Sequence, residues 1–582
     1  ALRRRSISNH KLIKPLKREQ YPVLLPLQIP AFVMKIVLIV VSFLMAVLSS
    51  CRENDSNGVV PEIEIDSVFV NDRHVVNQTI INEIDYRNVE IRVRFNTSVD
   101  TNRFNKDDFF LSGFAGSYHH RFDPSRKSLF IKPSEQVKPL SFYRLRIFPG
   151  QNLGGNLSGD YSFGFRTRID STPKFPIISD QELLTLVQRQ TFRFFWDYAH
   201  PVSGLTRERS GSGDLVTMGG SGFGLMAILV GIERNFITRQ QGFERIQTIV
   251  NFLNRTNTDK FHGAFPHWMS GTTGRTIPFS ARDDGADLVE TAFLMQGLLA
   301  VQEYFRNGSP EEQTIVPIIQ QMYENVQWSF FRRNNENVLY WHWSPNFGWA
   351  MNHQIGGWDE ALMVYVLAAG SPTHPIPAEV YHQGWARNGR YPMVNNQTFY
   401  GIRLPLGPTL GGPLFFSHYS FLGLDPRNLR DRYAHYWEQL VAHTLINRAY
   451  CIDNPRNFVG YSEYVWGLTA SDIEGGYTAS SPTNDVGVIA PTAALSSMPF
   501  TPEYSMQALR FFYYVLGDRI WGPHGFYDAF NLTTLWFARS YLAIDQGPII
   551  IMIENHRTGL IWDLFMRNAN VRRGLDALGF TY

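Results

Sequence analysis

The apolar residues of this chain change their spacing near Pro173, and this change divides the sequence between two kinds of fold. Before it, apolar and polar side chains alternate, as in the run VEIRVRF at 89–95, and a period of two is typical of half-buried strands. After it, Leu183, Leu184, Val187 and Thr191 recur at helical spacing. The sequence therefore predicts a β domain followed by an α-helical domain.

Residues 61–170 are predicted to form a small β-sandwich. Alternating runs recur at 128–132, 143–147 and 161–165, and turn-forming sequences at 123–124 and 154–156 separate them. Several short strands at this spacing are typical of a sandwich. The segment resembles the bacterial immunoglobulin-like domains found ahead of surface enzymes. It shows no cluster of titratable residues, so we expect a spacer or support, with carbohydrate binding as the alternative.

Residues 178–582 are predicted to be mainly helical. Ser179 or Asp180 is placed to cap the first helix, and further helices are expected at 221–235, 239–255, 284–306, 310–331, 358–369, 427–447, 502–516 and 545–567. Long loops rich in Gly, Pro, Trp and His join them, as at 261–279 and 467–482, and such loops usually carry function. Helix pairs joined by long loops fit a closed ring, an (α/α)6 toroid, and the scarcity of strands argues against a TIM barrel.

The N-terminal region carries an export signal. Residues 34–51 (MKIVLIVVSFLMAVLSSC) contain one Lys, an apolar run and small residues before Cys51, which is the layout of a signal peptide and is short for a membrane span. The ending resembles a bacterial lipobox, in which Cys51 is acylated; an uncleaved anchor helix is the alternative. We expect an exported lipoprotein, periplasmic or anchored at the outer membrane, with 1–33 as a spurious upstream extension and 52–60 as a tether.

The composition excludes several functions. Lys and Arg number 54 against 52 Asp and Glu, a net charge of +2, which gives no reason to expect nucleic acid as a partner. The two cysteines, Cys51 and Cys451, form no Cys/His cluster, so we expect no metal and no cofactor. The glycine run at 219–224 follows no strand, so it is not a nucleotide loop. We expect a monomer that meets the membrane through its lipid only.

Acidic residues gather in an unusual way at 281–292 (ARDDGADLVETA). If this segment is helical, Asp283, Asp287 and Glu290 share one face, because they are spaced i, i+4 and i+7. Three carboxylates on one face repel one another unless a ligand or donors compensate. The alternative is ordinary placement of acids at a helix N-terminus, which explains Asp283 more easily than Glu290.

Two further acidic motifs precede apolar helices. A Gly-Gly turn delivers Trp358, Asp359 and Glu360 to the start of the helix at 361–369, and a carboxyl beside an indole in a dry site has a raised pKa, which suits a general acid. Asp545, in the sequence AIDQGP, stands ahead of another apolar helix. Capping of the helix is the alternative for both motifs.

Other polar groups stand in aromatic company. The chain has 43 Phe, 26 Tyr and 13 Trp, which form either a large core or, in part, stacking platforms for sugar rings. Together with Trp358 and Asp359, the residues placed to hydrogen-bond or stack on sugars are His267, Trp268, Trp343, His418, Tyr419, Glu463 and Asp528.

As an ordered set, five motifs resemble a known family. They are QTFRFFW at 190–196, PVSGL at 201–205, the acids at 283–290, GWDEA at 357–361 and IDQGP at 544–548. Over about residues 178–570 the chain is similar to the glucoamylase-like family that contains bacterial β-1,2-glucanases, glycoside hydrolase family 144. The resemblance implies an (α/α)6 barrel, an inverting mechanism and no metal.

The resemblance also implies roles for the acids. Glu360 matches a catalytic acid, Asp283, Asp287 and Glu290 match acids that line the cleavage site, and Asp545 is a base by position. An inverting hydrolase holds its acid and base about 6.5–9.5 Å apart so that a water fits between them. We therefore expect cleavage of β-glucan, internally or with release of sophorose.

Three other functions remain open from the residues alone. An α-glucan hydrolase of the glucoamylase type would keep the same acids. A polysaccharide lyase would use groups such as His353, His418 and Tyr419, although the acidic motifs would repel its anionic substrate. A non-catalytic glycan-binding lipoprotein would use the aromatic residues without a working acid pair.

Overall fold

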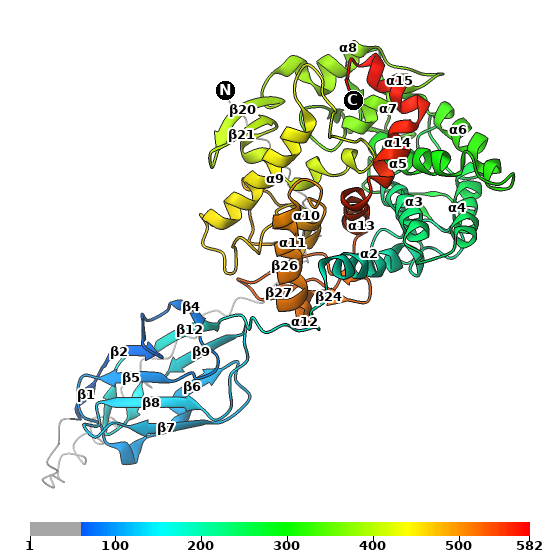
Figure 1. Cartoon of the computed structure of the whole chain (residues 1–582). Coiled ribbons are helices and arrows are strands. Elements are labelled where there is room, and N and C mark those ends of the chain that lie inside the picture. Colours follow the sequence, from blue (N-terminus) through cyan, green and yellow to red (C-terminus); the bar gives the residue numbers. More distant parts are fainter. Residues whose placement is uncertain (1–59) are drawn as a thin grey trace, which may run out of the picture.

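The computed structural model describes residues 60–582 (Figure 1). The predicted extension, signal peptide and tether, and the lipidation residue Cys51, fall at positions 1–60 and so lie outside this range, apart from Val60. Along the described range, no helix combines the length and the apolar character needed to cross a bilayer.

A β-sandwich occupies the first part of the described chain. One sheet has the order β3-β2-β5-β8-β7 (Arg73–Val75, Ile65–Val70, Ile91–Phe95, Ser128–Pro133 and Tyr118–Phe122). The other has the order β4-β12-β9-β6 (Ile80–Ile84, Tyr161–Thr167, Phe142–Ile147 and Phe109–Ser112). Their inner side chains form one core, which includes Val93, Leu129, Leu145 and Phe163.

The predicted alternating runs are confirmed as strands β5, β8, β9 and β12. The turn predicted at 154–156 is shorter than expected, because Gly155 and Asn156 belong to strand β11 (Gly155–Leu157), which pairs with β1 (Glu62–Ile63) and β10 (Gly150–Asn152). Assignment of the sandwich to the immunoglobulin-like class stays a prediction.

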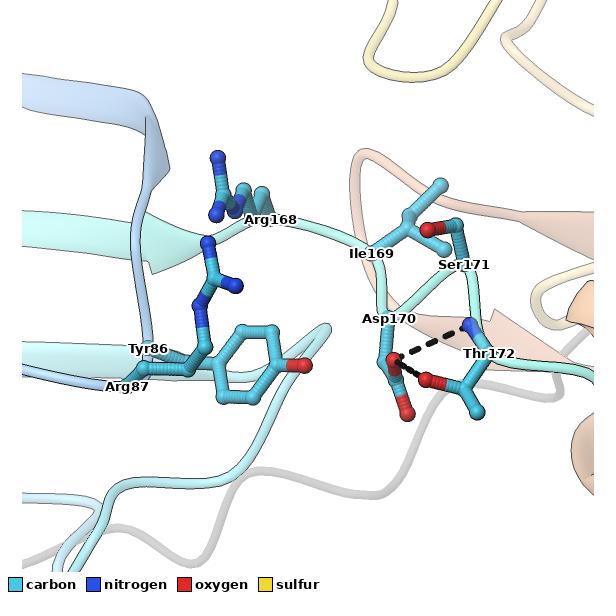
Figure 2. Close-up of a pocket in the computed structure, with 7 residues that line it drawn as sticks. All are labelled: Tyr86, Arg87, Arg168, Ile169, Asp170, Ser171 and Thr172. Atoms are coloured by element: carbon cyan, nitrogen blue, oxygen red, sulfur yellow. Dashed lines mark hydrogen bonds between the residues drawn. The ribbon is translucent and has the colours of Figure 1, made fainter.

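The junction between the two domains is short and tied on both sides. Figure 2 shows a hollow of about 340 Å³ between Tyr86 and Arg87 of the sandwich and the segment 168–172. Within that segment Asp170 accepts hydrogen bonds from Thr172, and it pairs with the Lys174 ammonium at 2.9 Å. The Lys174 backbone N–H donates to the Tyr514 carbonyl of the helical domain at 2.7 Å. The junction is therefore built from specific contacts.

The helical domain is a double ring (Figure 1). Its inner helices are almost wholly buried: α3 (Met218–Glu233), α5 (Leu288–Phe305), α7 (Leu362–Gly370), α10 (Pro491–Leu495) and α13 (Ala543–Arg557). Helix α13 contacts α3 and α10, and α5 contacts both α3 and α7. Helices with a polar face pack outside them: α2 (Asp180–Trp196), α4 (Arg239–Asn254), α6 (Ile315–Asn325), α9 (Tyr436–Asp453), α11 (Pro502–Arg510) and α15 (Ala569–Ala577). This is the predicted (α/α)6 toroid.

Several predicted helix boundaries are corrected by local turns. Of the two predicted caps of α2, Ser179 and Asp180, the structure shows Ser179, which forms a capping box. The helix predicted at 545–567 is two helices, α13 and α14 (Leu560–Arg567), because Gly559 breaks it with a φ of 75°. The helix predicted at 427–447 begins only at Tyr436, since Asp431 holds a turn by accepting from the Tyr433 and Ala434 N–H groups. The helix predicted at 310–331 is regular only over α6.

Candidate active site

Glu360 lies in the turn between strand β19 (Gln354–Ile355) and helix α7. Gly357 has a φ of 89°, a left-handed conformation that favours glycine, and the Glu360 carbonyl accepts a hydrogen bond from the Ser420 hydroxyl. The side chain of Glu360 is only partly buried. Desolvation by the surrounding protein and the neighbouring Asp359 raise the pKa of Glu360 to about 8. Its carboxyl therefore keeps a proton at neutral pH and can donate it.

Asp359 supports the same turn from inside. Its Oδ1 atom accepts hydrogen bonds from the Ala361 N–H at 2.9 Å and from the Trp385 indole at 3.0 Å. Burial raises the pKa of Asp359 to about 6, although these two donors oppose the shift. Asp359 therefore stabilises the turn and acts electrostatically on Glu360. Because its Oδ1 atom already accepts two hydrogen bonds, that atom has little capacity left to bind a sugar hydroxyl.

The acids at 283–290 converge, but not on one helical face as predicted. Ala286 and Asp287 form strand β16, which pairs with strand β18 (His342–Trp343), and α5 begins only at Leu288. A Cβ on Gly285 would come within 2.3 Å of the Trp343 carbonyl, so glycine permits the close pairing. Asp283 reaches the other acids from a turn, and Asp287 is the N-cap of α5.

Asp287 is held by four donors. Its Oδ1 atom accepts from the Val289 and Glu290 N–H groups, and its Oδ2 atom accepts from Trp341 Nε1 at 3.2 Å and lies 3.0 Å from His267 Nδ1. Burial alone would raise the pKa of Asp287, but the hydrogen bond to His267 and the other contacts lower it. Asp287 is therefore an ionised carboxylate at neutral pH.

Asp283 and Glu290 are the less ionised members of this group. Burial and the charge of Asp287 raise the pKa of Asp283 to about 7, and its buried Oδ1 atom has no hydrogen-bond partner in the part of the chain that the structure describes. Burial also raises the pKa of Glu290, which accepts hydrogen bonds from the Gly219 N–H and the Thr217 hydroxyl. Asp283 thus offers a free oxygen and a pKa near neutrality.

The glycine run at 219–224 explains how Glu290 finds its partners. The run lies within α3, and a Cβ on Gly222 would come within 2.0 Å of the Phe293 carbonyl on α5. Helices α3 and α5 therefore touch backbone to backbone, which brings the Gly219 N–H within 2.6 Å of the Glu290 carboxyl. Contrary to the prediction, the run does follow a strand, β13 (Leu215–Thr217). It lies inside helix α3 and not in a loop, so the interpretation that it is not a nucleotide loop rests on this place in the helix.

A second acidic group, the aspartate trio, consists of Asp472, Asp528 and Asp545. The Asp472 N–H donates to Asp528 Oδ2 at 2.7 Å, and Asp528 and Asp545 lie close enough for each to shift the pKa of the other. Burial and Asp472 raise the pKa of Asp528 to about 7, and burial and Asp528 raise the pKa of Asp545 well above its usual range. The Asp528–Asp545 pair therefore holds a proton at neutral pH.

Asp545 does not cap its helix, which was the alternative to catalysis. It lies in the first turn of α13, whose N-cap is Leu542, and its Oδ2 atom is buried without a partner among the described residues. A buried carboxyl oxygen left unpaired costs stability. The placement therefore favours a chemical role for Asp545 over a capping role.

Tyr419 connects the two acidic groups. Burial raises the pKa of Tyr419 most, and the charges of Asp545 and Glu360 raise it further. Its hydroxyl therefore lies within electrostatic reach of both carboxyls. Glu360 itself is reached by the charges of Asp287 and Glu290. Electrostatic interactions therefore link Glu360 to Asp287 and Glu290, and link Tyr419 to both Glu360 and Asp545.

Three predicted binding residues lie elsewhere. Trp358 is 4% exposed and packs on Phe421 and Tyr436, so its indole belongs to the core. His418 is buried against Ser497 at 3.0 Å and its pKa is lowered to about 3 by desolvation. Glu463 is exposed on a loop. None of the three is placed to contact a ligand together with the acids.

His267, Trp268 and Trp343 remain close to the site. His267 bridges Asp287 and Glu290. Trp268 packs at a tilt against Phe279, and its buried indole N–H has no partner within residues 60–582. Trp343 is partly buried and belongs to the strand that pairs with β16. The half-buried indole of Trp268 is suited to contact a sugar face.

Sequence reasoning missed several members of the site. His342 Nε2 lies 3.5 Å from Asp283 Oδ2 and 3.6 Å from Asp287 Oδ2. The run Trp341–His342–Trp343 marks His342 as a polar group in aromatic company, but the sequence did not place it beside these acids. Asp472 lies in the long loop at 467–482, which was itself predicted to be functional. Arg209, which pairs with Asp472 at 2.9 Å, had no sequence signal.

One grouping in the range 60–582 has the spacing of a metal site. His267, Asp283 and Asp287 each offer one ligand atom, and these atoms lie within 4.8 Å of one another. Asp287 already accepts hydrogen bonds from Val289, Glu290 and other donors through both oxygens. We assign no metal to it, because the same contacts satisfy the chemistry of an ionised, hydrogen-bonded carboxylate.

Comparisons with known proteins identify relatives of this site. Residues 352–569 match the family model named "Glycoamylase", described as "Putative glucoamylase". The chain is 44% identical over 428 residues to an exo β-1,2-glucooligosaccharide sophorohydrolase (non-reducing end) of Parabacteroides distasonis. That match covers 70% of this chain and 59% of the relative, so the chain spans less than two thirds of that protein's length.

Two solved structures resemble the chain. An endo-β-1,2-glucanase from Chitinophaga pinensis, in complex with sophorotriose and glucose, is 52% identical with a TM-score of 0.68, and the match covers 70% of this chain and 99% of that one. A β-1,2-glucanase from Parabacteroides distasonis is 36% identical with a TM-score of 0.68, over 88% of this chain and 74% of that one.

Proposed function

The chain belongs to the glucoamylase-like family that contains β-1,2-glucanases, glycoside hydrolase family 144, and from this premise we propose that it is an inverting hydrolase of β-1,2-glucan or its oligosaccharides. Of the relatives named above, the Chitinophaga pinensis protein is named an endo-β-1,2-glucanase, and one Parabacteroides distasonis protein is named an exo β-1,2-glucooligosaccharide sophorohydrolase. The observation that carries the proposal is the contrast between a protonated Glu360 and an ionised Asp287 at one site.

Glu360 is the general acid of this proposal. A pKa of about 8 keeps its carboxyl protonated at neutral pH, and its partly exposed side chain can reach a glycosidic oxygen. Donation of this proton allows the leaving sugar to depart as an alcohol. The ionised Asp287 lies near enough to raise the pKa of Glu360, so it also favours retention of the proton until a substrate arrives.

Two carboxyl groups qualify as the base that activates water. Asp283 has a free Oδ1 atom and a pKa of about 7, which suits proton uptake near neutrality. Asp545 has a free Oδ2 atom, and Asp528 beside it could take over a proton. His267, Trp341 and the α5 N–H groups hold Asp287 too firmly for it to serve as a base.

Product analysis tests the function. The protein would be incubated with linear β-1,2-glucan, β-1,3-glucan, starch and a uronate polymer, and the products would be separated by size. Cleavage of β-1,2-glucan alone is expected; sophorose as the sole early product would indicate chain-end release, and a range of oligomers internal cutting. Maltose or glucose from starch alone would show that the substrate is an α-glucan and not β-1,2-glucan. Unsaturated products from the uronate polymer would identify a lyase.

An activated substrate separates acid from base. Glu360→Gln is expected to lower turnover of β-1,2-glucan by about 10²–10⁴-fold while retaining most activity on an aryl β-sophoroside, because a good leaving group needs no proton. Asp283→Asn and Asp545→Asn are tested on both the glucan and the aryl β-sophoroside. The variant that lacks the true base should be slow on both substrates. Equal turnover of wild type and Glu360→Gln on glucan would refute the assignment.

We also propose that the protein is an exported lipoprotein. Support comes from the sequence at 34–51 alone, which is outside the described residues. Metabolic labelling with a radiolabelled fatty acid tests it: label that is present in the wild type and lost in Cys51→Ala supports the proposal, and an unlabelled wild type contradicts it.

A further inference from the structure

A hollow of about 490 Å³ opens beside the aspartate trio, and the steps of hydrolysis proposed above do not use it. Three segments line it: Arg209 and Ser210, the hairpin of β22 (Ala470–Ile473) and β23 (Gly476–Ala479), and residues 536–540 after strand β26 (Phe530–Asn531). Its volume lies in the range of pockets that hold small ligands.

The polar side of the hollow is rigid. Asp472 accepts hydrogen bonds from Arg209 Nη1 at 2.9 Å and from the Ser540 hydroxyl at 2.5 Å. Arg209 is held in turn by Glu208, with Nε 2.9 Å from a carboxylate oxygen. A carboxylate and a guanidinium fixed side by side offer an acceptor and donors to neighbouring hydroxyl groups, which is the arrangement that adjacent sugar hydroxyls require.

The other side is aromatic. Trp536 and Phe537 form strand β27 and are both partly exposed. An exposed indole next to hydrogen-bonding groups suits a ligand with one apolar and one polar edge, such as a pyranose ring. The charges also indicate a neutral ligand, since the two cations Arg209 and Arg539 are offset by the two carboxylates Glu208 and Asp472.

The hollow is joined to the acids of the cleavage site by a short path. The Asp472 N–H donates to Asp528 at 2.7 Å, and Asp528 lies close enough to Asp545 to raise its pKa. A glucan whose scissile bond lies among the acids would therefore extend toward Asp472.

We propose that this hollow, the Arg209–Trp536 pocket, is a sugar-binding subsite that holds a neutral glucose unit of the chain beyond the two sugars at the scissile bond. The inference rests on the proposed function. The Arg209–Trp536 pocket strengthens the binding of longer substrates only, so it sets the chain length that the enzyme prefers.

Gly476 allows the pocket to be filled without disturbing the fold. A Cβ added there would meet only Ile473 Cγ1, at 3.9 Å, and Gly476 has no left-handed backbone. Gly476→Leu should therefore occupy the pocket, and Trp536→Ala should remove its platform. The matched control is Phe110→Ala, because Phe110 is 55% exposed on the β-sandwich, away from the pocket.

The experiment compares kcat/KM for β-1,2-glucooligosaccharides of increasing length. Gly476→Leu and Trp536→Ala are expected to lower kcat/KM about tenfold for the longer oligomers, mainly through KM, and to leave the shortest cleaved oligomer unchanged, while Phe110→Ala changes neither. A loss that is the same at every length, or no loss at any length, would overturn the subsite.

A binding measurement keeps this test separate from the test of hydrolysis. Calorimetry with the Glu360→Gln protein and the same oligomers needs no turnover. Weaker binding of long oligomers when Gly476→Leu is added supports the subsite even if the assignment of Glu360 fails. Unchanged binding would refute the subsite, even for an enzyme that proves to cleave β-1,2-glucan.

Discussion

His267 Nδ1 lies 3.0 Å from the Oδ2 atom of Asp287, and this pair places a positive charge among the carboxyl groups at the start of α5. Burial alone would lower the pKa of His267, but Glu290 and the hydrogen bond to Asp287 raise it to about 9. An imidazolium therefore offsets repulsion among acids that the sequence places close together.

The first prediction concerns the pH dependence of stability. The pKa of His267 is about 9 in the folded protein against an ordinary 6.5, so its stabilising effect is fully present below about pH 6.5 and is lost as the pH rises through 9. We expect the difference in free energy of unfolding between wild type and His267→Gln to shrink over this range. Urea unfolding at several pH values measures it, and a difference that stays constant with pH would contradict the ion pair.

The second prediction concerns the pH dependence of activity. Because Asp359 raises the pKa of Glu360, Asp359→Asn should lower that pKa while its amide oxygen still accepts from Ala361 and Trp385. The basic limb of the kcat profile, expected near pH 8 in the wild type, should move to lower pH by about one unit. If the limb stays in place while kcat falls at every pH, Asp359 supports the turn and does not tune Glu360.

The order of the two domains could be predicted from the spacing of apolar residues, because a period of two indicates strands and helical spacing indicates helices. Asp283, Asp287, Glu290 and Glu360 could be singled out from the sequence because they stand in apolar or small-residue surroundings, where charge is costly without a purpose. The shared helical face was wrong because spacing says nothing about where a helix begins. Asp287 starts α5 as its cap, and the residues before it pair with β18.

The aspartate trio could not be predicted as a unit. Asp472 comes from strand β22, Asp528 from a loop and Asp545 from helix α13, and their proximity depends on how the ring closes. Trp358 shows a different limit, since it stands in the same motif as Glu360 but its indole is buried in the core. One sequence shows which residues are chemically unusual, but not which of them point to the same space.

The third prediction tests the contact between α3 and α5. A Cβ on Gly222 would come within 2.0 Å of the Phe293 carbonyl, so Gly222→Ala must push the helices apart. We expect a loss of about 3 kcal/mol in stability, the upper part of the range for overpacking, together with lower activity as the Gly219 N–H leaves Glu290. Gly476→Ala is the control and should change stability by less than about 0.5 kcal/mol. Equal effects of the two substitutions would refute the close contact.

The fourth prediction concerns a buried ion pair at the end of α13. Arg234 contacts both oxygens of Glu554, at 2.7 and 2.8 Å, and Glu554 is 1% exposed. Arg234→Met leaves a buried carboxylate without its cation and should cost about 3–5 kcal/mol. Arg510→Met breaks the Arg510–Asp180 pair, whose side chains are 46% and 45% exposed, and should cost less than about 1 kcal/mol.

Tryptophan fluorescence is the suitable measurement for this pair. The 13 Trp residues all lie between positions 196 and 562, so fluorescence during urea unfolding reports the helical domain and not the β-sandwich. The double variant Arg234→Met with Glu554→Met should recover much of the loss, because the cost comes from the unpaired charge and not from the absence of a pair. If the double variant is as unstable as Arg234→Met alone, loss of packing around α13 explains the effect in place of the charge.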